Sequence, residues 1–82
     1  MNERSYRWFH VRALPPRRGR KTRVYEVRAA SDGALLGTIS WYAPWRQFAF
    51  APQPNAVWSR DCLTDVADAV AAAHVAHRKQ EP

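Results

Sequence analysis

The residues with the clearest capacity for chemistry are cationic. Segment 17–23 holds five basic residues in seven and no apolar side chain that needs burial. Guanidinium and ammonium groups bind phosphates through charge-assisted hydrogen bonds, and a cluster of them attracts polyanions. The composition therefore predicts an exposed loop that binds phosphate through Arg17, Arg18, Arg20, Lys21 and Arg23.

A second group of candidate residues is the aromatic cluster in segment 41–50. Aromatic side chains bury large areas, so we expect most of this cluster to form core. Trp45 and Arg46 belong to a turn and are expected to contact a protein partner, since Trp and Arg often dominate interfaces. Arg46 is also expected to form a cation–π contact with Trp41 or Trp45.

The residue spacing argues against a metal site. His74 and His77 are three residues apart on one expected helix, which supplies at most two ligands. Cys62 is about 18 Å away along the same helix at 1.5 Å per residue. His10 would have to complete the set from a distant strand. We expect no metal and no cofactor, and the two histidines are expected to interact with the helix dipole.

Catalytic groupings are equally sparse. Ser59 and Asp61 have no histidine nearby, and the chain contains no glycine-rich phosphate loop. One alternative stays open: a small ribonuclease using His10, Glu26 and Arg28 on one sheet face for general acid–base cleavage. The expectation is a protein that is not an enzyme.

A single small domain, 1–82, has to position these side chains. Alternating apolar residues predict strands at 6–14, 24–30, 35–42 and 47–51. Helical spacing predicts a helix over about 60–78, capped by Ser59. The expected fold class is α+β: a four-stranded antiparallel meander spanning about 6–51, with a basic hairpin loop at 15–23 and one C-terminal helix packed on one face.

Turn lengths decide which side chains share a face. A three-residue loop ending at a left-handed Gly33 places Val27 and Ile39 on one face. A four-residue loop at 43–46 keeps Phe50 on that face, because proline does not fit the tighter hairpin turns. The expected core comprises Phe9, Val11, Tyr25, Val27, Leu35, Ile39, Trp41, Phe48 and Phe50, packed against the helix stripe Leu63, Val66, Ala67, Val70, Ala73, His74 and His77.

The opposite face of this sheet is expected to remain open to solvent. Its aromatic rings are suited to stack on bases, and its guanidinium groups are suited to bind phosphates or guanine edges. We therefore expect nucleic-acid binding through this face together with the basic loop. The candidates on the face are Trp8, His10, Arg12, Arg28 and Tyr42, with Thr38, Ser40 and Gln47 beside them.

Charge and composition limit the class of protein to which the chain can belong. The net charge is +6: residues 1–50 carry ten basic and three acidic residues (+7), and residues 51–82 carry three and four (−1). No apolar run reaches the roughly 18 residues of a membrane span, no signal-peptide pattern is visible, and one cysteine excludes an intramolecular disulfide. We expect a cytoplasmic protein without membrane contact whose partner is nucleic acid or an acidic protein complex. A homodimer is compatible with the sequence.

The segment from Gly37 to Pro52, followed by Val57-Trp58 and Cys62-Leu63, resembles a group of small uncharacterised bacteriophage and prophage proteins. The shared pattern is G-x-I-x-W-Y-x-x-W-R-x-aromatic-x-F-x-P, and the match covers roughly the C-terminal two-thirds of the chain. The resemblance implies a phage protein inside a bacterial host cell and implies no catalytic activity. It favours an alternative function: an inhibitor of a host defence or other host complex, of anti-CRISPR or anti-restriction type. The expected architecture is also similar to that of integrase arm-binding domains and plant ethylene-response DNA-binding domains.

Overall fold

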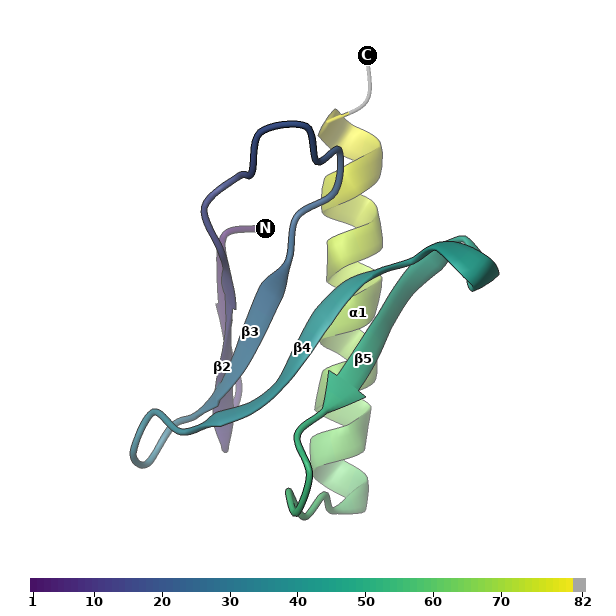
Figure 1. Ribbon diagram of the computed structural model, residues 1–82. Coiled ribbons are helices and arrows are strands. Elements are labelled where there is room, and N and C mark those ends of the chain that lie inside the picture. Colours follow the sequence, from purple (N-terminus) through teal and green to yellow (C-terminus); the bar gives the residue numbers. More distant parts are fainter. Residues whose placement is uncertain (81–82) are drawn as a thin grey trace.

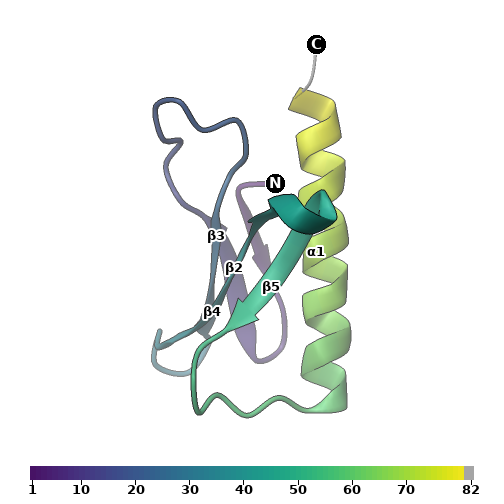
Figure 2. The ribbon, with the colours of Figure 1, turned by 45° about the vertical axis from the view of Figure 1, so that its right-hand side comes forward.

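The computed structural model describes residues 1–80, so the last two residues of the expected domain lie outside the described residues. Five strands form one antiparallel sheet in the order β1-β2-β3-β4-β5, and one helix, α1, lies on one side of it (Figures 1 and 2). The α+β class and the antiparallel meander are confirmed, with one strand more than predicted. The elements are β1 (Glu3–Ser5), β2 (Phe9–Ala13), β3 (Tyr25–Ala29), β4 (Leu35–Tyr42), the 3-10 helix η1 (Ala43–Trp45), β5 (Gln47–Pro52) and α1 (Arg60–Gln80).

The predicted first strand, 6–14, is wrong at its start. The chain turns at residues 6–8, where the Tyr6 N–H donates to the Phe9 carbonyl at 2.9 Å. Residues 3–5 then pair with β2 as an additional edge strand. All three residues of β1 are exposed, so no apolar alternation marks them as a strand. Trp8 consequently lies in the turn rather than on a strand.

The β3–β4 hairpin reaches the expected register by a different route. Val27 lies opposite Gly37, as predicted, but the next residue of β3 pairs with Leu35, which leaves Leu36 as the extra residue of a β-bulge. Leu36 therefore packs against the core in place of the expected Leu35. Gly33 adopts the left-handed conformation that was predicted, with φ +76°.

The loop of this hairpin is one residue longer than predicted. The Ala29 N–H donates to the Ala34 carbonyl at 2.9 Å, so residues 30–33 form a four-residue loop. The additional loop residue and the bulge offset one another, which is why the apolar residues of β3 and β4 still share a face. The β4–β5 connection agrees with the prediction, because Tyr42 pairs with Gln47 across residues 43–46.

The core lies between the sheet and α1. Its strand residues agree with the prediction except that Leu36 replaces Leu35, and Trp41 and Phe50 are only partly buried. The predicted helix stripe is wrong in part, because Leu63 is 51% exposed and Ala67 also faces outward. Small side chains on the facing side of α1 allow the helix to approach the sheet closely. The buried residues of this cluster are Phe9, Val11, Tyr25, Val27, Ile39, Phe48, Val66, Ala69 and Ala73.

Helix α1 begins as predicted, with the Ser59 hydroxyl accepting the Cys62 N–H at 3.1 Å. His74 has a different role from the one expected. Its Nε2 accepts the backbone N–H of Phe48 at 3.1 Å, which joins the helix to the edge strand β5. Within residues 1–80, no helix combines the length and the apolar character needed to cross a bilayer.

A polar cluster fastens β1 and the following turn to α1. The Tyr6 hydroxyl donates to Asp68 Oδ2 at 2.6 Å, and Arg4 Nε lies 3.1 Å from the same oxygen. The Tyr6 hydrogen bond is the main cause that holds the pKa of Asp68 below its ordinary value. Partial burial, reinforced by the bond to Asp68, raises the pKa of Tyr6 to about 12.

Gly37→Ala is expected to destabilise the fold by about 1–3 kcal/mol through overpacking. A Cβ at this position would lie 2.6 Å from Cε1 of Phe50 and 2.8 Å from the Ala51 carbonyl oxygen. Urea unfolding measures the change. In a Phe50→Ala background the same substitution is expected to cost less, since the ring is absent. A Gly37→Ala variant as stable as the wild type would contradict the packing of Phe50 over Gly37.

The Tyr6 phenol is expected to titrate with a pKa of about 12, against its ordinary value of 10.0. The folded protein holds this proton more tightly than the unfolded chain. Its contribution to stability is therefore complete below pH 10 and is lost as the pH rises towards 12. The difference between the ultraviolet titrations of the wild type and Tyr6→Phe isolates this phenol. Asp68→Asn should lower the pKa part of the way, because burial remains; an unchanged value would argue against the Tyr6–Asp68 bond.

Candidate nucleic-acid interface

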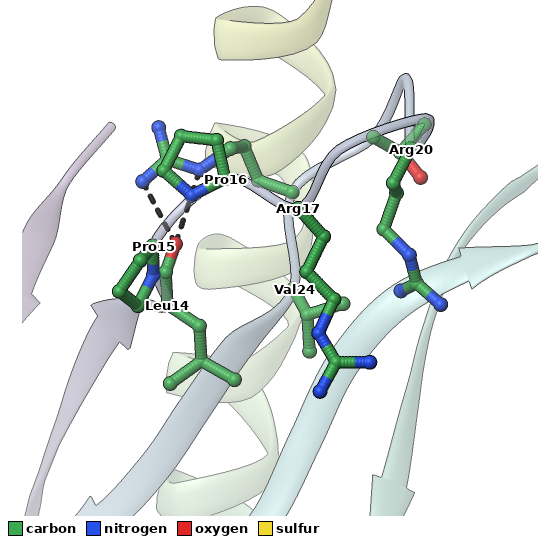
Figure 3. A pocket seen from close by; sticks show the side chains of 8 residues that line it. Leu14, Pro15, Pro16, Arg17, Arg20 and Val24 are labelled. Atoms are coloured by element: carbon green, nitrogen blue, oxygen red, sulfur yellow. Dashed lines mark hydrogen bonds between the residues drawn. The ribbon is translucent and has the colours of Figure 1, made fainter.

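The basic loop, residues 15–23, is closed at its base by an arginine. The Leu14 N–H donates to the Val24 carbonyl at 2.8 Å, which extends the β2–β3 ladder by one pair. Arg23 then donates from Nε and Nη2 to the Leu14 carbonyl, at 3.2 and 2.9 Å (dashed lines in Figure 3). The Arg23 guanidinium, predicted to bind nucleic acid, thus joins the two ends of the loop.

A tight turn at the tip of the basic loop brings two arginines together. The Arg20 N–H donates to the Arg17 carbonyl at 3.1 Å, and Gly19 has φ +82°. This combination is a type II β-turn, which needs glycine at its third position and places its first and last residues within about 7 Å. In Figure 3 the side chains of Arg17 and Arg20 extend in the same direction, with the sheet and then α1 behind them.

The inner side of the loop forms an open hollow with a mixed lining (Figure 3). Two prolines and the apolar side chains at the ends of the strands form one part of the wall. The guanidinium groups of Arg17 and Arg20 provide positive charge at the hollow. The lining residues are Leu14, Pro15, Pro16, Arg17, Arg20, Thr22, Arg23 and Val24.

Most of the net charge of the protein resides in this loop. Segment 17–23 carries five basic residues and no acid, which is +5 of the total +6 and leaves +1 for the rest of the chain. Four of these residues are exposed, and their side chains make no hydrogen bond or ion pair within the described part of the chain. They are Arg17, Arg18, Arg20 and Lys21.

The open sheet face brings the expected strand residues together, but its charges are largely balanced. His10 lies opposite Arg28, and Arg12 lies between Glu3 and Glu26 on the neighbouring strands. Arg28 donates to Glu26 at 3.1 Å and to the Gly33 carbonyl at 2.9 Å. The Arg28 guanidinium is therefore already occupied.

Arg12, on the same face, is exposed. Its guanidinium makes no hydrogen bond or ion pair with the described residues. It lines a second open hollow that adjoins the base of the basic loop. His10 approaches Ser5 Oγ with Nδ1 at 3.1 Å. Because Glu26 is ion-paired with Arg28, the grouping considered for a ribonuclease has its carboxylate engaged.

The aromatic candidates lie at opposite ends of the sheet. The Trp8 carbonyl accepts the Ala30 N–H at 3.0 Å, at the end of the sheet farthest from the basic loop. The Arg7 guanidinium lies 4.8 Å from the centre of the Trp8 ring. The structure therefore does not bring Trp8 together with the basic loop.

Tyr42 and Trp45 lie at the same end of the sheet as the basic loop. Their ring centroids are 4.8 Å apart with planes at 80°, and the residues are 44% and 64% exposed. With Ser40 they border an open hollow whose floor includes Ala49 and Ala51. Neither alanine was among the residues predicted for the site, although the alternation of β5 places both on the face opposite the core positions.

The prediction of a cation–π contact for Arg46 is wrong. Arg46 is exposed and in a left-handed conformation, with φ 52°. Trp45 instead meets the Tyr42 ring edge-on, and the described cation–π contacts are made by Arg4 and Arg7. Nowhere in residues 1–80 do three or more His, Cys, Asp or Glu side chains gather as a metal site would require.

Comparison of the chain with protein-family models, with curated proteins and with solved structures gives no match. The resemblance to small phage proteins therefore stays a prediction.

Arg23→Ala is expected to destabilise the protein by about 1–3 kcal/mol, because it leaves the Leu14 carbonyl without its charged donor. Arg18→Ala is the matched control, since this exposed arginine has no partner within residues 1–80 and should change stability by less than about 0.5 kcal/mol. Thermal unfolding distinguishes the two variants. Equal stabilities would contradict the role of Arg23 at the base of the loop.

Proposed function

We propose that this protein binds nucleic acid, with the basic loop as the principal contact to phosphates. The observation that carries the proposal is the exposed cluster Arg17, Arg18, Arg20 and Lys21, which lacks internal partners in residues 1–80. Breaking an internal ion pair costs free energy before the released charge can bind a ligand. These four side chains have no such pair to break. The near-neutral remainder of the chain makes this loop the site where a polyanion is attracted most strongly.

The chemistry of the loop supports binding to the backbone rather than reading of bases. Each guanidinium presents a planar set of donors that matches two phosphate oxygens. The type II turn sets Arg17 and Arg20 side by side before any ligand arrives, so less side-chain entropy is lost on binding. Phosphate contacts of this kind give affinity with little sequence preference.

The open sheet face contributes less than its arginines suggest. Arg12 places one further guanidinium near the base of the basic loop, and it makes no bond within the described chain, although Glu3 and Glu26 lie opposite it on the neighbouring strands. Arg28 contributes through its effect on Glu26, whose negative charge it neutralises. A binding role is favoured over catalysis, because Glu26, the carboxylate of the grouping considered for a ribonuclease, is engaged in that ion pair.

A second candidate function is binding of an acidic protein complex of a host cell. Trp45, 64% exposed beside Arg46, is the observation that favours it. Exposed Trp and Arg side chains commonly act as the anchors of protein interfaces. In this alternative the basic loop assists encounter but does not hold the ligand.

The salt dependence of oligonucleotide binding tests the proposal. Arg17→Ala/Arg20→Ala and the control Arg60→Ala/Arg78→Ala both lower the net charge from +6 to +4, and the control residues are exposed on α1. Loss of two phosphate contacts should make the negative slope of log affinity against log salt shallower by about 1.4–1.8 in the loop variant. The control should keep the wild-type slope. Fluorescence anisotropy at several salt concentrations measures both.

Equal losses in the two variants would show that total charge, rather than the basic loop, determines binding. Failure of the wild-type protein to bind any oligonucleotide at low salt would overturn the proposal. Stoichiometric binding of a defined protein partner that survives both substitutions would then favour the second candidate.

A further inference from the structure

We infer that the nucleic acid is single-stranded, with an unpaired base seated against Tyr42 and Trp45 while the adjoining phosphates lie on the basic loop. The inference rests on the proposed function and adds the class of nucleic acid and a second contact. It begins from the aromatic corner, the hollow bordered by Ser40, Tyr42, Trp45, Ala49 and Ala51.

The shape of the aromatic corner suits a flat ring. Because the Tyr42 and Trp45 planes stand at 80° with centroids 4.8 Å apart, the two rings form two walls that are nearly perpendicular. A base that stacks on one wall meets the other wall edge-on, which is the favourable arrangement for aromatic rings. Ala49 and Ala51 are too small to fill the corner, and the Ser40 hydroxyl offers a hydrogen bond beside it.

The exposure of these rings is unusual in a domain with so few residues to form a core. Tyr42 is 44% and Trp45 64% exposed, while the aromatic residues at neighbouring positions, Trp41 and Phe48, pack towards α1. The neighbouring rings meet one another and His74 on the helix side. The strand alternation therefore directs Tyr42 away from the core, on the open face.

The aromatic corner and the basic loop belong to the same end and the same face of the molecule. In an antiparallel meander the β2–β3 and β4–β5 connections emerge at one end, and Figures 1 and 2 show the loop and η1 there. Tyr25 pairs with Ile39, the residue before Ser40, and Ser40 pairs with Ala49. The base of the loop is thus two strands from Ala49, about 10 Å at the usual strand spacing.

This separation refers to the base of the loop, and an extended strand of a few nucleotides can run from the aromatic corner past this point to the arginines of the turn. A duplex supplies phosphates to the basic loop equally well, but its bases are stacked on one another. Seating a base in the aromatic corner would then require flipping, which costs a few kcal/mol. The loop alone does not distinguish the two forms, whereas the aromatic corner favours the single strand.

Binding of a thymidine oligonucleotide of about 15 nucleotides, compared with a duplex of equal length, tests the inference. Trp45→Ala removes one wall of the corner and, since Trp45 is mostly exposed, should leave the fold intact by circular dichroism. We expect it to weaken single-strand binding about 5- to 140-fold, the range for loss of one base stack, and to leave duplex binding unchanged. Trp8→Ala is the matched control, an exposed indole at the far end of the sheet, and should change neither affinity.

The outcomes separate this inference from the proposed function. Equal effects of Trp45→Ala and Trp8→Ala on the single strand, or equal binding of the two nucleic acids by the wild type, would overturn the inference. The proposed function would still stand if Arg17→Ala/Arg20→Ala weakened binding of both. If the wild type bound neither the single strand nor the duplex, the inference and the proposed function would both be overturned. Trp45 would then be left as an anchor for a protein partner.

Discussion

Five side chains of β2, β3 and β4 lie almost completely buried beneath α1, and this packing decides where the other side chains of the sheet point. They are Phe9, Val11, Tyr25, Val27 and Ile39, each 0–1% exposed. A chain of this length buries only about 60–65% of its unfolded surface, so this one core supplies most of the available hydrophobic stabilisation. Because side chains alternate along a strand, the intervening polar residues are placed on the open face.

The separation of structural from available cations follows from that arrangement. Arg4, Arg23 and Arg28 each lie beside an acceptor that folding brings within reach, namely a carboxylate or a loop carbonyl. The loop between β2 and β3 has no such acceptor near its tip, since segment 17–23 contains no acid. Its cations therefore stay exposed, and the arginine at its base holds the loop in position.

Much of the fold could be predicted from local patterns. The position of β4, the connection at residues 43–46 and the Ser59 cap follow from alternation, proline and capping preferences. β1 could not be predicted, because its residues are polar and it exists only through pairing with β2 and through the bond of Tyr6 to Asp68. Leu63 points outward because the buried stripe of α1 runs through Val66, Ala69, Ala73 and Ala76, and hydrophobicity alone ranks Leu63 above those alanines.

The candidate site was predictable in composition but not in arrangement. Five basic residues in seven identify the basic loop from the sequence alone. The engagement of Arg23 by a carbonyl and of Arg28 by Glu26 depends on the pairing register and on backbone atoms, which the residue types do not encode. The turn at residues 6–8 was not recognised, so Trp8 was predicted on the open face and lies instead in that turn, at the end of the sheet farthest from the loop.

The most direct test of the central claim, that the basic loop and the adjoining end of the open face receive nucleic acid, is a residue-by-residue map of binding. Two-dimensional amide NMR during titration with a single-stranded oligonucleotide provides it. The account predicts that the largest shift changes fall on the amides of residues 17–21 and on the indole N–H of Trp45. Largest changes at the Trp8 indole or along the outer face of α1, with the loop amides unmoved, would contradict it.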